Sequence, residues 1–193
     1  MIVTLGSYSS PGQLPPAKSL FDPYTTCSLP DGPSVVETAP LAPGVTTRGV
    51  KTVKGMLAVK MLDGRRIMFA YPGEDFYANL KVEILPADTW SDARNVLDDN
   101  FDYLLASGDD VRNYSLRPEL NGFSIEGQDR TKRVGGVLGF YLLFDSATHT
   151  TVTIYFLNQE PPVRFKTMKE YAALRDRFLN GYTTCVRKGL QSR

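Results

Sequence analysis

The 193-residue chain contains one histidine, two cysteines and one tryptophan. One histidine and two cysteines argue against a zinc site, which usually takes four such ligands, and we expect no cofactor and no metal. No apolar run approaches the roughly 20 residues needed to cross a bilayer, so no transmembrane segment is expected. The first residues, Met1–Ser7, lack the basic start and apolar stretch of a signal peptide. The sequence does not assign a compartment: the chain as written would be cytoplasmic, and it would be periplasmic or secreted if a leader had been removed and Cys27 and Cys185 were oxidised to a disulfide.

The net charge of +1 argues against bulk attraction to nucleic acid, so a nucleic-acid partner is not expected. The charge is nevertheless uneven along the chain. Residues 74–110 carry 10 acidic and 2 basic side chains, whereas residues 111–193 carry 7 acidic and 13 basic ones. This pattern fits a solvated acidic helix face opposite a basic C-terminal surface. A polarised binding surface is the alternative.

Cys27 and Cys185 lie near opposite ends of the chain, and each ends a Tyr-Thr-Thr-Cys tetrapeptide. A disulfide between them would pin the N-terminal region to the C-terminal region, which requires an oxidising compartment. The alternative is two unrelated thiols, one of them buried as a small hydrophobic side chain.

Proline is concentrated near the N-terminus, where 8 of the 13 prolines fall between Pro11 and Pro43. Proline fixes φ and removes a backbone donor, so residues 1–45 are predicted to form an extended arm that could contain one short strand and that lies over the domain or is partly mobile. Phe21, Tyr24 and Leu29 could anchor this arm by burial. No linker interrupts the remainder, and residues 46–193 are predicted to form a single domain. The oligomeric state is left open.

Alternating and continuous apolar runs predict the strands. Asp63-Gly64 between the runs Met56–Leu62 and Arg65–Tyr71 indicates a tight hairpin. From residue 78 to residue 85, apolar side chains alternate with Asn79, Lys81 and Glu83, which predicts a strand with one buried face and one water-facing side. The remaining predicted strands are Leu120–Gln128, Gly136–Phe144 and Thr150–Leu157.

Two amphipathic helices are predicted, one over residues 89–106 and one that begins after Thr167. Thr167 and Glu170 have the spacing of a capping box, and Asn180-Gly181 is expected to end the second helix. The order β-β-β-α-β-β-β-α without βαβ alternation indicates an α+β fold. We expect an antiparallel sheet of about six strands packed with two main helices and preceded by the proline-rich arm.

This order of elements resembles the PsbP-like superfamily, which includes the extrinsic photosystem II protein PsbP, DcrB-type bacterial proteins and a nuclear-import factor that binds the GTPase Ran. The resemblance is carried by Ala78–Ala106 and by Leu120–Cys185, with Gly135-Gly136 before a long hairpin. It implies a binding or accessory protein rather than an enzyme, by analogy of fold. The proline-rich arm departs from the compact core of that family.

Candidate catalytic groups do not form a recognisable site in the sequence. His149 lies beside Asp145 and Ser146 in one predicted turn, and residues so close together seldom form a triad. Neighbours in a helix point about 100° apart, so Asp98 and Asp99 are not expected to converge on one substrate. We therefore assign no catalytic residue.

The best binding candidate is a patch of aromatic side chains with arginines nearby as polar anchors. The residues assigned to it are Tyr141, Tyr155, Phe165, Arg164, Arg175 and Arg177. The sequence thus predicts a non-catalytic binding or accessory protein that engages a protein partner through the sheet face or the arm. The alternative is a small-molecule binder or hydrolase that uses a groove between sheet and helix.

Overall fold

The computed structural model describes residues 19–29, 32–42, 46–73, 76–106, 111–114, 119–134, 137–158, 165 and 167–193. In these residues, seven strands form one sheet in the order β1-β4-β5-β9-β8-β7-β6, and β2 and β3 form a small second sheet. All neighbouring strands are antiparallel. The strands are β1 Ser34–Ala42, β2 Thr46–Thr52, β3 Gly55–Met61, β4 Asp63–Ala70, β5 Tyr77–Ile84, β6 Val111–Tyr114, β7 Ser124–Val134, β8 Val137–Asp145 and β9 Thr150–Leu157.

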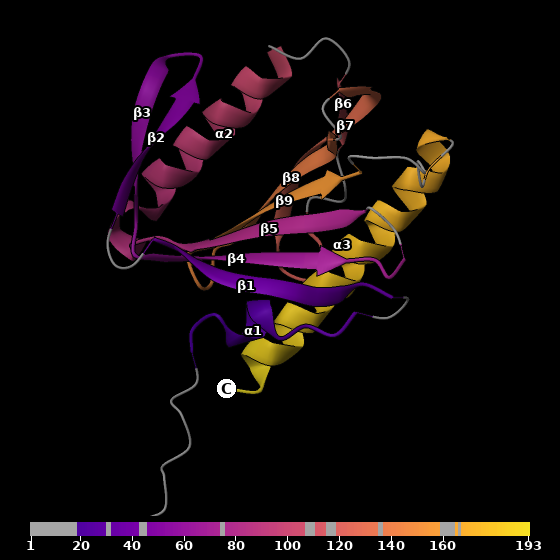
Figure 1. The fold of residues 1–193 in the computed structure, drawn as a ribbon. Coiled ribbons are helices and arrows are strands. Elements are labelled where there is room, and N and C mark those ends of the chain that lie inside the picture. Colours follow the sequence, from indigo (N-terminus) through magenta and orange to yellow (C-terminus); the bar gives the residue numbers. More distant parts are fainter. Residues whose placement is uncertain are drawn as a thin grey trace, which may run out of the picture.

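Three α-helices accompany the sheets in the described residues. They are α1 Asp22–Thr25, α2 Trp90–Ala106, which follows the 3₁₀ turn η1 Ala87–Thr89, and α3 Met168–Gln191. Figure 1 shows α3 and α1 against one side of the large sheet, and α2 with β2 and β3 on the other side. The predicted α+β class, with an antiparallel sheet and two main helices, is confirmed. Within the described residues, no helix is both long and apolar enough to span a bilayer.

The predicted hairpin at Asp63-Gly64 is wrong. Met56–Leu62 does contribute a strand, β3, but β3 pairs with β2 through a turn at Val53-Lys54. Gly64 lies inside β4, opposite Glu83 of β5. Gly64 does not adopt positive φ, whereas Gly55, at the start of β3 and directly after the turn, does so at 110°. The chain therefore crosses from the small sheet to the large one at the position where a tight turn was expected.

The C-terminal helix begins as predicted and ends later. Thr167 is the N-cap, and its hydroxyl accepts a hydrogen bond from the backbone N–H of Glu170 at 3.2 Å. The helix then continues past Asn180-Gly181 to Gln191. A glycine inside a helix costs about 1 kcal/mol. The burial of Tyr182 and Val186, both 0% exposed, offsets that loss.

The region predicted as an extended arm is part of the domain wherever the structure describes it. α1 packs on α3, and β1 is the nine-residue edge strand of the large sheet, paired with β4. Phe21 and Tyr24, at 3% and 1% exposed, bury α1 in the main core. Two bulges interrupt the pairing of β1, between Val35 and Glu37 and between Pro40 and Ala42. Such irregularities discourage further strands from adding to an exposed edge.

Side chains on the two faces of the sheet enter two separate cores. The larger core lies between the sheet and α3, where the ring of Phe156 meets that of Phe178 edge-on at 5.2 Å. The smaller core lies beneath α2, where Trp90 meets Phe144 edge-on at 6.3 Å. β8 supplies both cores, as its continuous apolar run predicts for a strand covered on both faces.

Candidate functional site

The structure divides the predicted aromatic patch between the two faces of the sheet. Tyr141 and Phe165 are buried on the α3 side, whereas Tyr155 lies on the opposite face with 38% of its surface exposed. The reason is the register, because Tyr155 pairs with Phe140 rather than with Tyr141. Directly opposed residues share a face. The three aromatic residues therefore do not line one surface.

The two predicted arginines that the structure describes, Arg175 and Arg177, are likewise separated from Tyr155, because both belong to α3 on the opposite side of the sheet. Arg177 is exposed on α3, and Arg164 lies outside the described residues. Arg175 is only 5% exposed and donates hydrogen bonds to the carboxylates of Asp129 and Asp176. These two carboxylates neutralise the buried guanidinium, so Arg175 is part of the protein interior and does not act as a polar anchor on the surface.

Tyr141 and Arg175 belong to one buried polar cluster between β7, β8 and α3. The Tyr141 hydroxyl donates a hydrogen bond to the Asp129 carboxylate, which also accepts one from Arg175. The same Tyr141 hydroxyl lies 2.6 Å from the Tyr171 hydroxyl. Burial raises the pKa of the Tyr141 hydroxyl well above its usual value, and neighbouring Tyr171 and Asp129 add to this effect. The hydroxyl therefore remains a neutral donor. The cluster fixes α3 to the sheet and is structural.

Of the described elements, α2 and the β2–β3 hairpin cover only part of the face that carries Tyr155. Two rows of opposed residues beyond them keep part of their surface accessible, and we call these eight residues the open face. The rows are Met68, Asn79, Tyr155 and Phe140, and then Ala70, Tyr77, Leu157 and Val137. All but Asn79 are apolar or aromatic, so this is an accessible and mainly apolar stretch of sheet.

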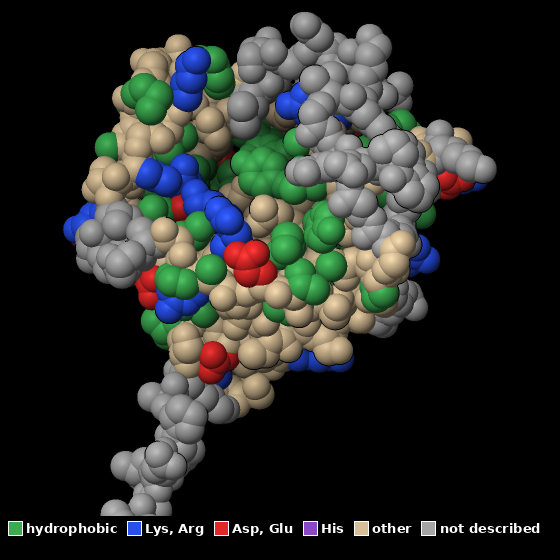
Figure 2. Space-filling view, viewed as in Figure 1, with side chains coloured by type: hydrophobic (Ala, Val, Ile, Leu, Met, Phe, Trp, Pro, Cys, Tyr) green, Lys and Arg blue, Asp and Glu red, His purple; other side chains and the backbone are tan. Residues whose placement is uncertain are grey.

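Stacked rings form the centre of the open face. The rings of Phe140 and Tyr155 lie 5.0 Å apart at a tilt of 37°, and Phe101 of α2 stacks on Phe140 at 6.1 Å. Figure 2 shows hydrophobic side chains gathered in a hollow on this side of the molecule, with lysine and arginine side chains beside them. Because Phe101 and Phe140 support it, Tyr155 is held as a fixed contact surface at little further entropic cost.

Charged side chains border the open face on its β2 side. Arg48 of β2 makes two hydrogen bonds to the Glu83 carboxylate, at 3.0 and 2.9 Å, and Lys81 lies 2.8 Å from the same carboxylate. Glu83 is 1% exposed. Burial lowers the pKa of Lys81 and Arg48 lowers it further, although Glu83 opposes them. Burial raises the pKa of the Tyr155 hydroxyl, and the positive charge of Arg48 partly offsets this rise. Arg48 and Glu83 both act on Tyr155, so this ion pair lies close to the aromatic rings of the open face.

Sequence reasoning missed most of this border. Asn79, Lys81 and Glu83 were assigned to the water-facing side of their strand, and Arg48 lay in no predicted strand. The alternation of β5 does contain the signal, because it places Asn79 and Lys81 on one face. The position of Tyr155 on that same face required the pairing of β5 with β9.

Two carboxyl groups meet at the far side of the same face, between α2 and β7. Asp98 and Glu126 share a hydrogen bond, and Arg94 lies beside them. Burial raises the pKa of Glu126 to about 7, with Asp98 adding to the rise. Asp99 points elsewhere, 2.7 Å from Lys54 of the hairpin. Among the described residues, no group of three or more histidine, cysteine, aspartate or glutamate side chains could hold a metal ion.

His149 lies in the turn between β8 and β9, with φ at 51° and its ring 5.6 Å from Trp90. Its backbone carbonyl accepts a hydrogen bond from Leu85. Asp145, the last residue of β8, is buried and instead accepts a hydrogen bond from the hydroxyl of Tyr24 in α1. The His149 ring therefore packs at the N-terminal end of α2, and the Asp145 carboxylate does not orient it.

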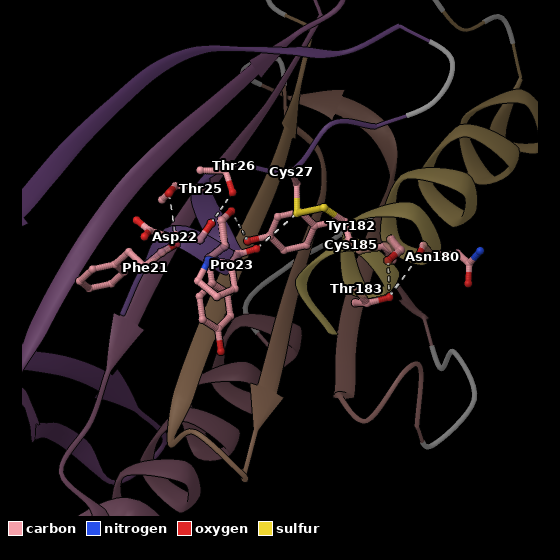
Figure 3. Close-up of a disulfide and its surroundings, with 12 residues drawn as sticks. Phe21, Asp22, Pro23, Thr25, Thr26, Cys27, Asn180, Tyr182, Thr183 and Cys185 are labelled. Carbon is pink, nitrogen blue, oxygen red and sulfur yellow. Dashed lines mark hydrogen bonds between the residues drawn. A yellow bond between two sulfur atoms is a disulfide. The ribbon is translucent and has the colours of Figure 1, made fainter. Parts of the chain in front are cut away.

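Cys27 and Cys185 are joined by a disulfide, with their Cα atoms 5.7 Å apart. Figure 3 shows the bond connecting Cys27, which follows the C-cap residue of α1, to Cys185 in the last third of α3, beside Tyr182. The Tyr182 hydroxyl donates to the backbone carbonyl of Tyr24 at 3.2 Å. The disulfide thus ties the N-terminal region to α3, and of the two possibilities stated for these cysteines the structure contains the disulfide and not two separate thiols.

An open pocket of about 320 Å³ lies beside this disulfide, lined by residues 25–28 and 33–35. Its side chains are threonine, serine, valine, proline and the disulfide itself, none of them charged. Such a lining offers hydroxyl and backbone hydrogen bonds but no charged group to orient a ligand.

Comparison of the chain with protein-family models, with curated proteins and with solved structures finds no match.

Proposed function

We propose that this chain is a non-catalytic binding or accessory protein that engages a protein partner through the open face. The observation that carries the proposal is the 38% exposure of Tyr155 on rings supported by Phe140 and Phe101. Supported aromatic residues that remain accessible on an apolar surface are typical of protein–protein contacts. The resemblance to the PsbP-like superfamily points in the same direction and remains a prediction.

The compartment proposed for this activity is an oxidising one. The disulfide between Cys27 and Cys185 is consistent with such a compartment, because cytosolic thiols are normally kept reduced. A periplasmic or extracellular partner follows from that assignment.

Photo-crosslinking tests the proposal at a single position. A benzophenone amino acid replaces Tyr155, which preserves an aromatic ring, and the matched control carries it at Val53 in the hairpin turn, 62% exposed. Irradiation of the two variants in cells of the organism that produces the protein should give an adduct of protein size from position 155 and none from position 53.

The same experiment separates the alternative functions. An adduct of small-molecule mass at position 155 would replace the proposal with a small-molecule binder. Equal adducts at both positions, or none at 155, would remove the open face as a binding surface.

A further inference from the structure

The open face has an excess of positive charge at its β4–β5 end. Arg66 of β4 and Lys81 of β5 are directly opposed in the register, so they share a face one row beyond Met68 and Asn79. Arg66 is exposed. Two cations therefore stand next to the aromatic and apolar row, and Arg48 approaches the same place from β2.

The carboxylates near these cations do not balance them. Glu83 carries one negative charge and already contacts both Arg48 and Lys81, at 2.9 and 2.8 Å. Glu37, opposite Met68 on the edge strand β1, adds a second carboxylate. Among the residues that the structure describes, three cations against two carboxylates leave a net positive charge at this end. Asp98 and Glu126 lie at the β7 end, where Arg94 faces them.

We propose that the β4–β5 end of the open face binds an extended acidic segment of the protein partner, with a carboxylate at Arg66 and Lys81 and an apolar side chain on Met68 and Tyr155. This inference rests on the proposed function and names the chemistry of its partner. Charge complementarity of this kind sets specificity and the rate of encounter.

Strand geometry fixes the spacing of the two ligand groups. Residues two apart in a strand lie about 7 Å apart on one face, which is the separation between the row of Asn79 and the row of Lys81. An extended peptide has the same repeat along each of its sides. A segment running along β5 therefore presents its apolar and acidic side chains at positions i and i+2.

Selection from a displayed library of random 12-residue peptides tests this inference without knowledge of the partner. The targets are the full wild-type chain, Tyr155→Ala, Arg66→Glu and the control Arg177→Glu, which makes the same charge change on the exposed surface of α3. Circular dichroism melting confirms that each variant is folded. Both arginine positions are exposed, so the substitutions disturb no core.

The expected enriched peptides are net acidic, with an aromatic or large aliphatic residue two positions from an aspartate or glutamate. Their affinity, measured by fluorescence anisotropy, should fall about tenfold for Arg66→Glu and stay within about twofold for Arg177→Glu. The loss should shrink between 50 and 300 mM salt, because screening weakens exposed charge pairs. Tyr155→Ala should abolish enrichment.

The failures of the two proposals are distinguishable. The acidic assignment would be overturned, with the open face kept as a binding surface, if the peptides that require Tyr155 were neutral or basic. The same conclusion would follow if Arg66→Glu and Arg177→Glu weakened peptide binding equally. Peptides enriched equally on wild type and Tyr155→Ala, or no enrichment, would overturn both.

Discussion

Removal of the disulfide should destabilise the protein by several kcal/mol without changing its fold. The bond closes a loop with a sequence separation of 158 residues. The chain-entropy account then gives about 5 kcal/mol, and measured losses in other proteins are about 2–5 kcal/mol. For a chain of this size, each kcal/mol corresponds to roughly 2–4 °C in melting temperature. We therefore expect Cys27→Ala/Cys185→Ala to melt about 10 °C below the wild type.

Native packing should survive this change because α1 is held by more than the bond. Phe21 and Tyr24 are buried in the main core, and the Tyr24 hydroxyl lies 2.8 Å from that of Thr148. The crosslink therefore acts mainly by restricting the unfolded chain. Its loss should increase the dependence of unfolding free energy on urea, because a chain without the crosslink exposes more surface when it unfolds.

Urea titration of the oxidised wild type, the reduced wild type and the double variant provides the assay. The reduced wild type and the double variant should coincide within about 1 kcal/mol, with thiol titration confirming that the bond is open. If reduction left both the midpoint and the urea dependence unchanged, the reasoning from loop closure would be refuted. If near-native spectra were lost on reduction, the packing account of α1 would be refuted instead.

Two further predictions concern the two faces of the sheet. A Cβ at residue 139 would overlap the hydroxyls of Tyr141 and Tyr171. Gly139→Ala should therefore lower the free energy of unfolding, measured by urea titration, by about 1–3 kcal/mol. An unchanged free energy of unfolding would contradict the close packing around Gly139. Burial raises the pKa of Glu126 from 4.5 to about 7, so the native state holds this proton more tightly, and stability present below pH 4.5 should be lost as pH rises through 7. Because the group is partly solvated, we expect a loss of about 1 kcal/mol over this range, absent in Glu126→Gln; equal pH profiles for the two proteins would contradict this origin.

Local patterns were sufficient to predict most elements of the fold. The alternation of β5 as far as Val82, the N-cap at Thr167 and the helical period after Trp90 each depend on neighbours a few residues away, and all three are confirmed. The hairpin at Asp63-Gly64 failed because two strands can be adjacent in sequence and yet belong to different sheets. The choice of partner strand is a tertiary property, made here by a competing turn at Val53-Lys54.

The candidate site was less predictable because it depends on register between strands far apart in sequence. Phe140 and Tyr141 are consecutive, so they lie on opposite faces of β8. The sequence does not show which of them shares a face with Tyr155, because that depends on the register between β8 and β9. A bulge between Val137 and Gly139 contributes to that phase. Arg48 was missed for a related reason, because its contact with Glu83 joins the small sheet to the large one.

The buried cluster beneath α3 and the open face above the sheet are consequences of one register. A slip of β8 by one residue would move every side chain of that strand to the other face. It would carry the Tyr141 hydroxyl away from Asp129 and leave the buried pair of Asp129 and Arg175 without a donor that now satisfies it. Such a loss in a buried network costs more than an exposed contact can return. The interior cluster therefore selects the register in which Phe140 lies beside Tyr155. The exposure of Tyr155 on the open face thus follows from the way α3 is fixed to the opposite face.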